Sequence, residues 1–116
     1  MSREIVVHRS FAAPRMLVFD AWTNAEHLDR WMGPRGFVTT TISLDFRVGG
    51  EWNYWMRHAE YGEFRNRIRY REVVPGERLV YEHDAGVDGD PNGFVVTVTF
   101  KEVAGRTELT FHTVFH

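Results

Sequence analysis

The side chains of this chain that could do acid–base or metal chemistry near neutral pH include six histidines. None of them lies in an HExxH zinc pattern, and no serine is flanked by glycines as in a nucleophile elbow. His112 and His116 are four residues apart, which on a strand separates them by about 13 Å, too far for one metal ion to bridge. For His83, beside Tyr81 on a predicted strand, two roles are open: a polar contact with a ligand, or a structural hydrogen bond.

The segment Asp88-Gly89-Asp90-Pro91-Asn92-Gly93 matches the opening of a calcium-binding EF-hand loop, with oxygen-bearing side chains at positions 1, 3 and 5 and glycine at position 6. The twelfth position, which should be a glutamate, is Thr99, and the flanking segments have the pattern of strands. We therefore interpret the segment as a hairpin loop in which Asp, Asn and Gly supply the turn geometry. Neither a metal nor a cofactor is expected.

Four arginines alternate along one predicted strand, at Arg65, Arg67, Arg69 and Arg71. Such a row could contact phosphate or an acidic partner, but the formal net charge of the chain is −2, so no nucleic-acid partner is expected. We interpret the row as a solvated sheet face whose charges pair across strands with residues such as Glu51, Glu82 and Glu102. An acidic client is the alternative.

The composition is that of one domain, residues 1–116, large enough to bury roughly two-thirds of the surface that its unfolded form exposes. The absence of cysteine excludes disulfides, thiolate metal sites and a cysteine nucleophile. The first residues lack the apolar run of a signal peptide, and no window approaches the ~20 apolar residues of a membrane span. We therefore expect a soluble, cytoplasmic protein.

The pattern of apolar residues predicts a strand, two short helices and then about six antiparallel strands, an α+β arrangement. The first strand covers residues 5–11. Pro14 suits the first turn of a helix whose inner side would carry Leu17, Val18, Ala21 and Trp22. Asn24 is expected to cap a second helix that ends at Trp31. The later strands are predicted at residues 37–45, 50–57, 61–74, 78–84, 93–103 and 106–115.

Alternation within these strands predicts an apolar inner face of the sheet, because successive side chains point to opposite sides. Large rings are mixed there with isolated polar groups, which is typical of a small-molecule pocket, although many of these residues could simply form a packed core. The candidate ligand-binding residues on this face are Trp52, Tyr54, Met56, Phe64, Asn66, Ile68, Tyr81, His83, Phe94, Val96 and Phe111.

Several blocks of the sequence together resemble bacterial members of the family of ATPase activator homologues of the 90-kDa heat-shock protein. This family belongs to the SRPBCC superfamily, with the START-like and birch-pollen-allergen-like proteins. The blocks are Phe11-Ala12-Ala13-Pro14-Arg15, Val18-Phe19-Asp20-Ala21-Trp22-Thr23, Glu26-His27-Leu28, Trp31-Met32-Gly33-Pro34-Arg35-Gly36-Phe37 and Asp45-Phe46-Arg47-Val48-Gly49-Gly50-Glu51-Trp52. In the last two blocks, bulky aromatic residues adjoin glycines, which adopt backbone conformations that other residues reach only with strain.

The resemblance implies a helix-grip fold, in which a curved antiparallel sheet wraps a long C-terminal helix and a cavity lies between them. The two short helices would then close one end of the sheet, and Trp31 and Phe37 would border the mouth of the cavity. The sequence ends at His116, where the long helix should begin. We therefore expect that this helix is missing from the sequence or that another chain, as in a homodimer, covers the sheet.

Three functions follow as hypotheses. The first is non-catalytic binding of a small, largely hydrophobic molecule in the cavity. The second is suggested by cyclase-like and aromatase-like relatives in the superfamily, and would use Tyr54 and His83 as acid and base. The third, implied by the family name, is a co-chaperone that activates an ATPase, although this chain has no second domain for binding its client.

Overall fold

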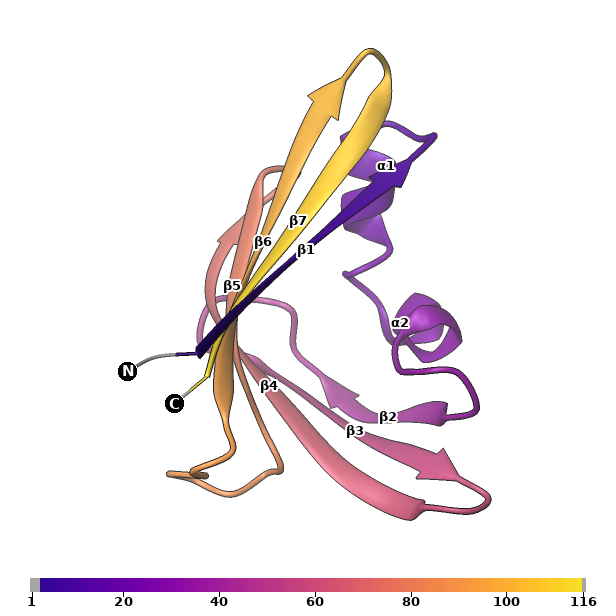
Figure 1. Cartoon of the computed structure of the whole chain (residues 1–116), viewed down its shortest axis with the longest axis vertical. Helices are drawn as coiled ribbons and strands as arrows, with labels where there is room; N and C mark the ends of the chain where they lie inside the picture. Colours follow the sequence, from indigo (N-terminus) through magenta and orange to yellow (C-terminus); the bar gives the residue numbers. More distant parts are fainter. Residues whose placement is uncertain (1–2, 116) are drawn as a thin grey trace.

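The protein is described by a computed structural model that covers residues 3–115, so His116 of the histidine pair lies outside the described residues. Seven strands form one antiparallel sheet in the order β1-β7-β6-β5-β4-β3-β2 (Figure 1). The elements are β1 (Arg3–Phe11), α1 (Arg15–Asp20), α2 (Ala25–Trp31), β2 (Val38–Leu44), β3 (Glu51–His58), β4 (Gly62–Val74), β5 (Arg78–Asp84), β6 (Phe94–Val103) and β7 (Arg106–Phe115). The predicted antiparallel sheet with two short helices after its first strand is confirmed, and no helix follows β7 within residues 3–115.

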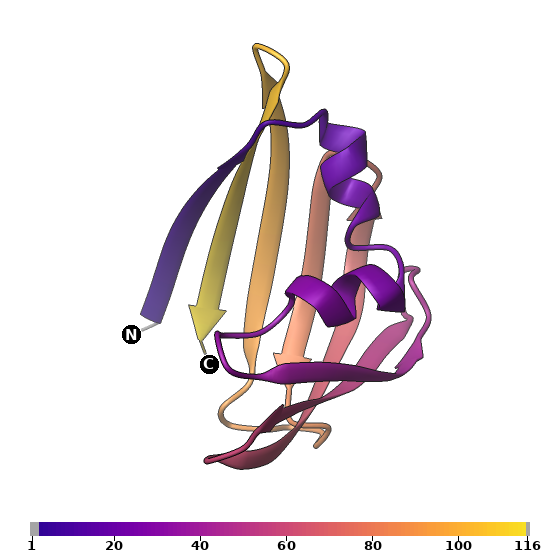
Figure 2. The ribbon, with the colours of Figure 1, turned by 90° about the vertical axis from the view of Figure 1, so that its right-hand side faces the viewer.

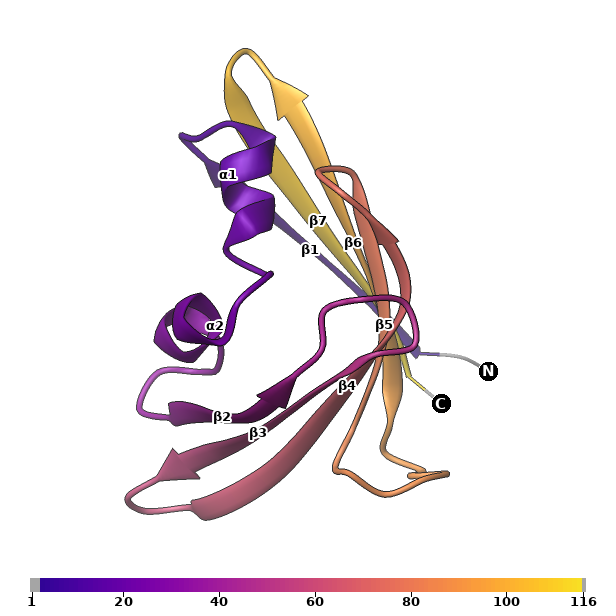
Figure 3. The ribbon, with the colours of Figure 1, turned by 180° about the vertical axis from the view of Figure 1, so that it is seen from behind.

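The sheet is strongly curved, and both helices lie on its concave side (Figure 1). Figure 2 looks onto this side and shows α1 and α2 in front of the strands, with β1 and β7 at one edge. The β5–β6 loop, residues 85–93, projects on the opposite, convex side, as Figure 3 shows from behind. Within residues 3–115, no helix is both long and apolar enough to cross a membrane.

The core lies between the two helices and the concave face. Phe19 of α1 packs edge-on against Phe46 and Phe100, with ring centroids 5.8 and 5.4 Å apart. Leu28 of α2 is completely buried. The predicted inner side of the first helix is confirmed for Trp22, which is buried, and for Val18, which packs against the core. It is wrong for Leu17, which is 62% exposed, while Phe19 points into the core instead.

Polar contacts fix α2 over the sheet. As predicted, the Asn24 side chain caps the helix, its Oδ1 accepting from the His27 amide at 2.9 Å. Thr41 of β2 links helix and sheet, because its hydroxyl donates to Asp29 of α2 at 2.6 Å and accepts from the Trp52 indole at 3.0 Å. The two Thr41 bonds satisfy polar groups that would otherwise be partly buried without partners.

Two glycines of the resemblance blocks have clear structural reasons. Gly33 has φ of +106°, a conformation that side chains other than glycine rarely adopt. At Gly50 a Cβ atom would lie 2.1 Å from the backbone oxygen of Asp45, so the tight turn between β2 and β3 has no room for one. The aromatic residues beside these turns are therefore held in fixed positions.

Candidate functional site

A groove of about 730 Å³ lies on the concave side, between the β1–β7 edge and the two helices. Ten of its twelve lining residues are apolar, and the other two are Arg9 and Thr113. The apolar residues are Val7, Phe11, Ala13, Leu17, Val18, Ala21, Trp22, Trp31, Leu109 and Phe111. The volume is within the range of small-molecule sites, about 300 to 1,000 Å³.

The walls of the groove come from segments far apart in the sequence. Alternation along β1 directs Val7, Arg9 and Phe11 to the concave face, and the register pairs Val7 with Phe111 and Arg9 with Leu109 of β7. This pairing brings the first and last strands together as one wall. The groove is accessible to solvent, because its rim residues are substantially exposed.

Two tryptophans form the opposite wall. The Trp22 ring is 4.7 Å from that of Trp31 and 5.8 Å from that of Phe111, centroid to centroid. The Trp31 indole donates to the backbone oxygen of Ala21 at 3.0 Å. This bond ties the last residue of α2 to the C-terminal end of α1 and so fixes the ring. Since both rings are held by neighbours, the wall is largely formed before any ligand arrives.

Of the residues proposed from sequence to bind a ligand, Trp31 and Phe111 line the groove. Five others are buried in the core beneath the helices: Trp52, Tyr54, Ile68, Tyr81 and Val96. Phe37 and Phe64 are neighbours near the tip of the β3–β4 hairpin, 6.1 Å apart, and Met56 is half-buried on β3. The remaining three, Asn66, His83 and Phe94, are partly buried on the concave side.

Polar side chains of three neighbouring strands meet on the concave face around His83. Its Nε2 atom lies 2.9 Å from Asn66 Oδ1 and 3.2 Å from the Tyr54 hydroxyl. Because the Asn66 amide nitrogen donates to the Phe64 carbonyl, its oxygen faces His83 and accepts the Nε2 hydrogen. His83 thus makes the structural hydrogen bond that the sequence left as one of two roles.

Burial keeps this cluster uncharged near neutral pH. Desolvation lowers the pKa of His83 to about 4, although nearby Asp84 acts in the opposite direction. Desolvation, together with Tyr81 and Tyr70, raises the pKa of Tyr54 far above its ordinary value. Both groups are therefore neutral at pH 7, and neither lines the groove.

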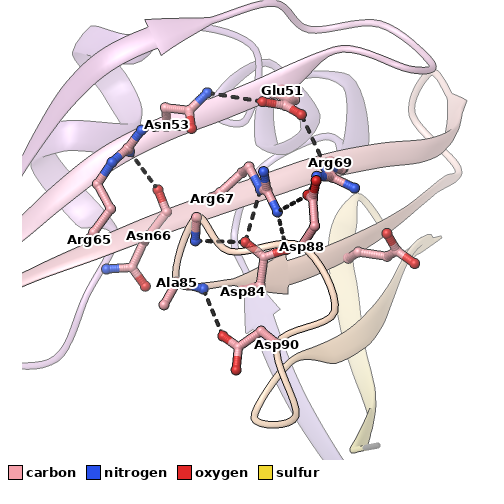
Figure 4. A network of polar contacts seen from close by, with 12 residues as sticks. Glu51, Asn53, Arg65, Asn66, Arg67, Arg69, Asp84, Ala85, Asp88 and Asp90 are labelled. Carbon is pink, nitrogen blue, oxygen red and sulfur yellow. Dashed lines mark hydrogen bonds and ion pairs between the residues drawn. The ribbon is translucent and has the colours of Figure 1, made fainter.

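The arginine row lies on the convex face and is largely paired (Figure 4). Arg67 donates to both oxygens of Asp84, at 2.9 and 2.8 Å, and to Asp88 at 2.9 Å. Arg69 contacts Glu51 at 3.1 Å and also pairs with Asp88 of the β5–β6 loop. The predicted pairing across strands is therefore confirmed for Glu51.

Two further glutamates were expected to pair with this row. Arg71 bonds to Glu82, as predicted. The expectation for Glu102 is wrong, since its carboxylate instead accepts from the Arg15 amide at 3.2 Å.

Residues 85–93 form the loop expected from the Asp-Gly-Asp-Pro-Asn-Gly segment. Asp90 accepts from the amides of Ala85 and Asn92, at 3.1 and 2.9 Å, which is turn geometry. Hydrogen bonds from Arg69 and Arg67 hold the pKa of Asp88 below its ordinary value. In the described chain, no three His, Asp or Glu side chains are grouped so that they could hold a metal ion.

With this geometry in view, comparisons with known proteins place the chain. A family model described as "Activator of Hsp90 ATPase homolog 1-like protein" matches residues 12–114. The chain belongs to this family. A search of curated proteins gives no match.

Solved structures of bacterial proteins share the family fold. A crystal structure from Chromobacterium violaceum is 30% identical with a TM-score of 0.86, over 95% of this chain and 77% of that one. Solution structures from Staphylococcus epidermidis and Arthrobacter aurescens have TM-scores of 0.86 and 0.89, at 26% and 20% identity. They cover 97% of this chain and 71% and 69% of those chains, respectively. The helix-grip resemblance stated from sequence is thus confirmed at the level of family and fold.

Proposed function

We propose that this chain binds a small, largely apolar molecule in the groove between the β1–β7 edge and the helices, without transforming it. The observation that carries the proposal is the hollow itself: about 730 Å³ with ten apolar lining residues, open to solvent at its rim. The family fold is compatible with hydrophobic ligand binding. No metal or cofactor is needed for such a function.

The groove can supply enough free energy for binding. Burial of apolar surface contributes about 25 cal/mol per Å², so a ligand that removes roughly 200 Å² from water gains about 5 kcal/mol before the entropic cost of association. The two tryptophan rings add specific stacking contacts for ring-containing ligands. We therefore expect a preference for flat aromatic molecules over chains of equal apolar area.

A neutral environment-sensitive dye, Nile red, tests the proposal. The dye should gain fluorescence with the protein and be displaced by an aromatic panel. Val7→Trp should fill the groove and abolish dye binding, whereas Val6→Trp, on the opposite face of the same strand, should bind as the parent does. Equal binding by both variants, or no binding of dye and panel by the parent, would contradict the proposal.

The acid–base alternative has one favourable observation, the contact between Tyr54 and His83. It ranks second because neither residue lines the groove. The two functions differ in the fate of the ligand. A ligand recovered unchanged supports binding, whereas a cyclised or dehydrated product that Tyr54→Phe no longer forms supports the enzyme.

A further inference from the structure

One charged residue lines the mainly apolar groove, and its position follows from the register of β1. Arg9 occupies the concave face between Val7 and Phe11, opposite Leu109 of β7. Elsewhere on this face the strands present mainly apolar side chains, so an arginine here is an exception to the alternation. A charged side chain beside an apolar hollow adds little to the stability of the sheet. The groups that contact the Arg9 guanidinium can therefore indicate whether it serves a ligand.

Arg9 differs from most arginines of the chain in having no acidic partner. Its Nη1 atom donates to the His8 carbonyl at 3.1 Å, and no carboxylate within residues 3–115 lies within 4 Å of its guanidinium. Eight other arginines have a carboxylate oxygen within 4 Å: Arg15, Arg30, Arg47, Arg57, Arg67, Arg69, Arg71 and Arg78. The guanidinium at the groove thus keeps most of its donors available.

The chemistry of that group defines what it would bind. A guanidinium presents parallel N–H groups that match the two oxygens of a carboxylate, and it remains charged at any physiological pH. The adjacent hollow accepts an apolar body. A molecule that satisfies both must carry one anionic group beside a hydrophobic skeleton.

We propose that the ligand of this groove is an amphipathic monocarboxylate, whose apolar body lies between Trp22, Trp31 and Phe111 and whose carboxylate pairs with Arg9. This inference rests on the proposed binding function and specifies its ligand class. A protein segment lying in the groove, from a second copy or another chain, would bury the same apolar surface but would not require an isolated carboxylate.

A matched pair of probes, biphenyl-4-carboxylate and biphenyl-4-carboxamide, isolates the charge. Titration calorimetry at pH 7 and low salt should show the acid binding about threefold more tightly than the amide, since an ion pair at an exposed arginine contributes less than about tenfold. Added salt should narrow this ratio, because it screens the exposed pair.

Variants then locate the effect. Arg9→Gln should remove the preference for the acid by weakening acid binding more than amide binding, and Arg9→Lys should restore part of the preference. Arg106→Gln is the matched control, because Arg106 contacts Ser10 and does not line the groove. Thermal melting confirms that each variant is folded.

The failures of the two proposals are distinguishable. Equal affinity for acid and amide, or an Arg9→Gln variant that weakens both equally, overturns the carboxylate assignment while ligand binding stands. Binding of neither probe nor Nile red overturns both. A concentration-dependent dimer that excludes both probes assigns the groove to a second copy of the chain and also overturns the inference.

Discussion

Different interactions hold the side chains on the concave face and on the convex face of the sheet. On the concave face, Trp52 and Tyr54 are buried by packing beneath α1 and α2. On the convex face, the arginines of β4 are held by carboxylates from β3, β5 and the β5–β6 loop. On the convex face, ion pairs form wherever strand register brings opposite charges together. On the concave face, by contrast, the two short helices cover only part of the curved sheet. The apolar face is therefore where a hollow remains.

The largest effect should come from the packed part of the concave face. Leu28→Ala removes a completely buried side chain and should lower the free energy of unfolding by about 3 to 4 kcal/mol. Urea denaturation measures this value, and added salt should change it little. A loss below about 1 kcal/mol would mean that α2 does not seal the core as described.

The polar cluster around His83 should make stability depend on pH. Its pKa is lowered from 6.5 to about 4 on folding, so between these values the unfolded chain binds a proton that the folded chain does not. Stability should therefore fall by about 3 kcal/mol as pH drops from 6.5 to 4. Denaturation series on the parent and on His83→Gln check this, and the variant should lack this fall. Parallel curves would show that another group is responsible.

The convex face should respond to the loss of a buried charge. The Arg67 and Asp84 side chains are only 11% and 13% exposed, so Asp84→Asn, which leaves Arg67 without its main partner, should cost about 2 kcal/mol. Asp88→Asn is the control: the Asp88 side chain is 81% exposed, and its replacement should leave the melting temperature almost unchanged. Equal losses in both variants would mean that the loop contact stabilises the sheet as strongly as the buried pair.

The smallest stability effect should occur at the groove. Leu17→Ala changes a side chain that is 62% exposed, so unfolding free energy should move by no more than about 0.5 kcal/mol. Because Leu17 lines the groove, the same change should weaken Nile red binding by about threefold. A folded variant with unaltered dye affinity would place the ligand elsewhere on the concave face.

Much of this fold could be predicted from sequence because its signals are local. Turn residues and period-two alternation locate the strands to within one or two residues, and the Asn24 cap follows from the side chain alone. The burial of Phe19 in place of Leu17 could not be predicted in this way. A helix of six residues is too short for its period to distinguish Phe19 from Leu17 as the buried position.

The groove depends on which strands pair and in what register, and the alternation of residues within one strand does not reveal this. Val7 and Arg9 became candidates only when β1 was seen beside β7, and Trp22 only when α1 was seen over that edge. The wrong pairing of Glu102 has the same origin. Glu102 lies on β6, and β5 separates that strand from the arginines of β4.

In the sheet, β1 has a single neighbour, β7, and its register joins Arg3 to Phe115. During synthesis β1 therefore cannot pair until β7 has left the ribosome, whereas the hairpins between them can form earlier. One wall of the groove therefore depends on the pairing with the largest sequence separation in the sheet. Ligand binding in the groove should accordingly be recovered late in refolding, after burial of Trp52 is complete.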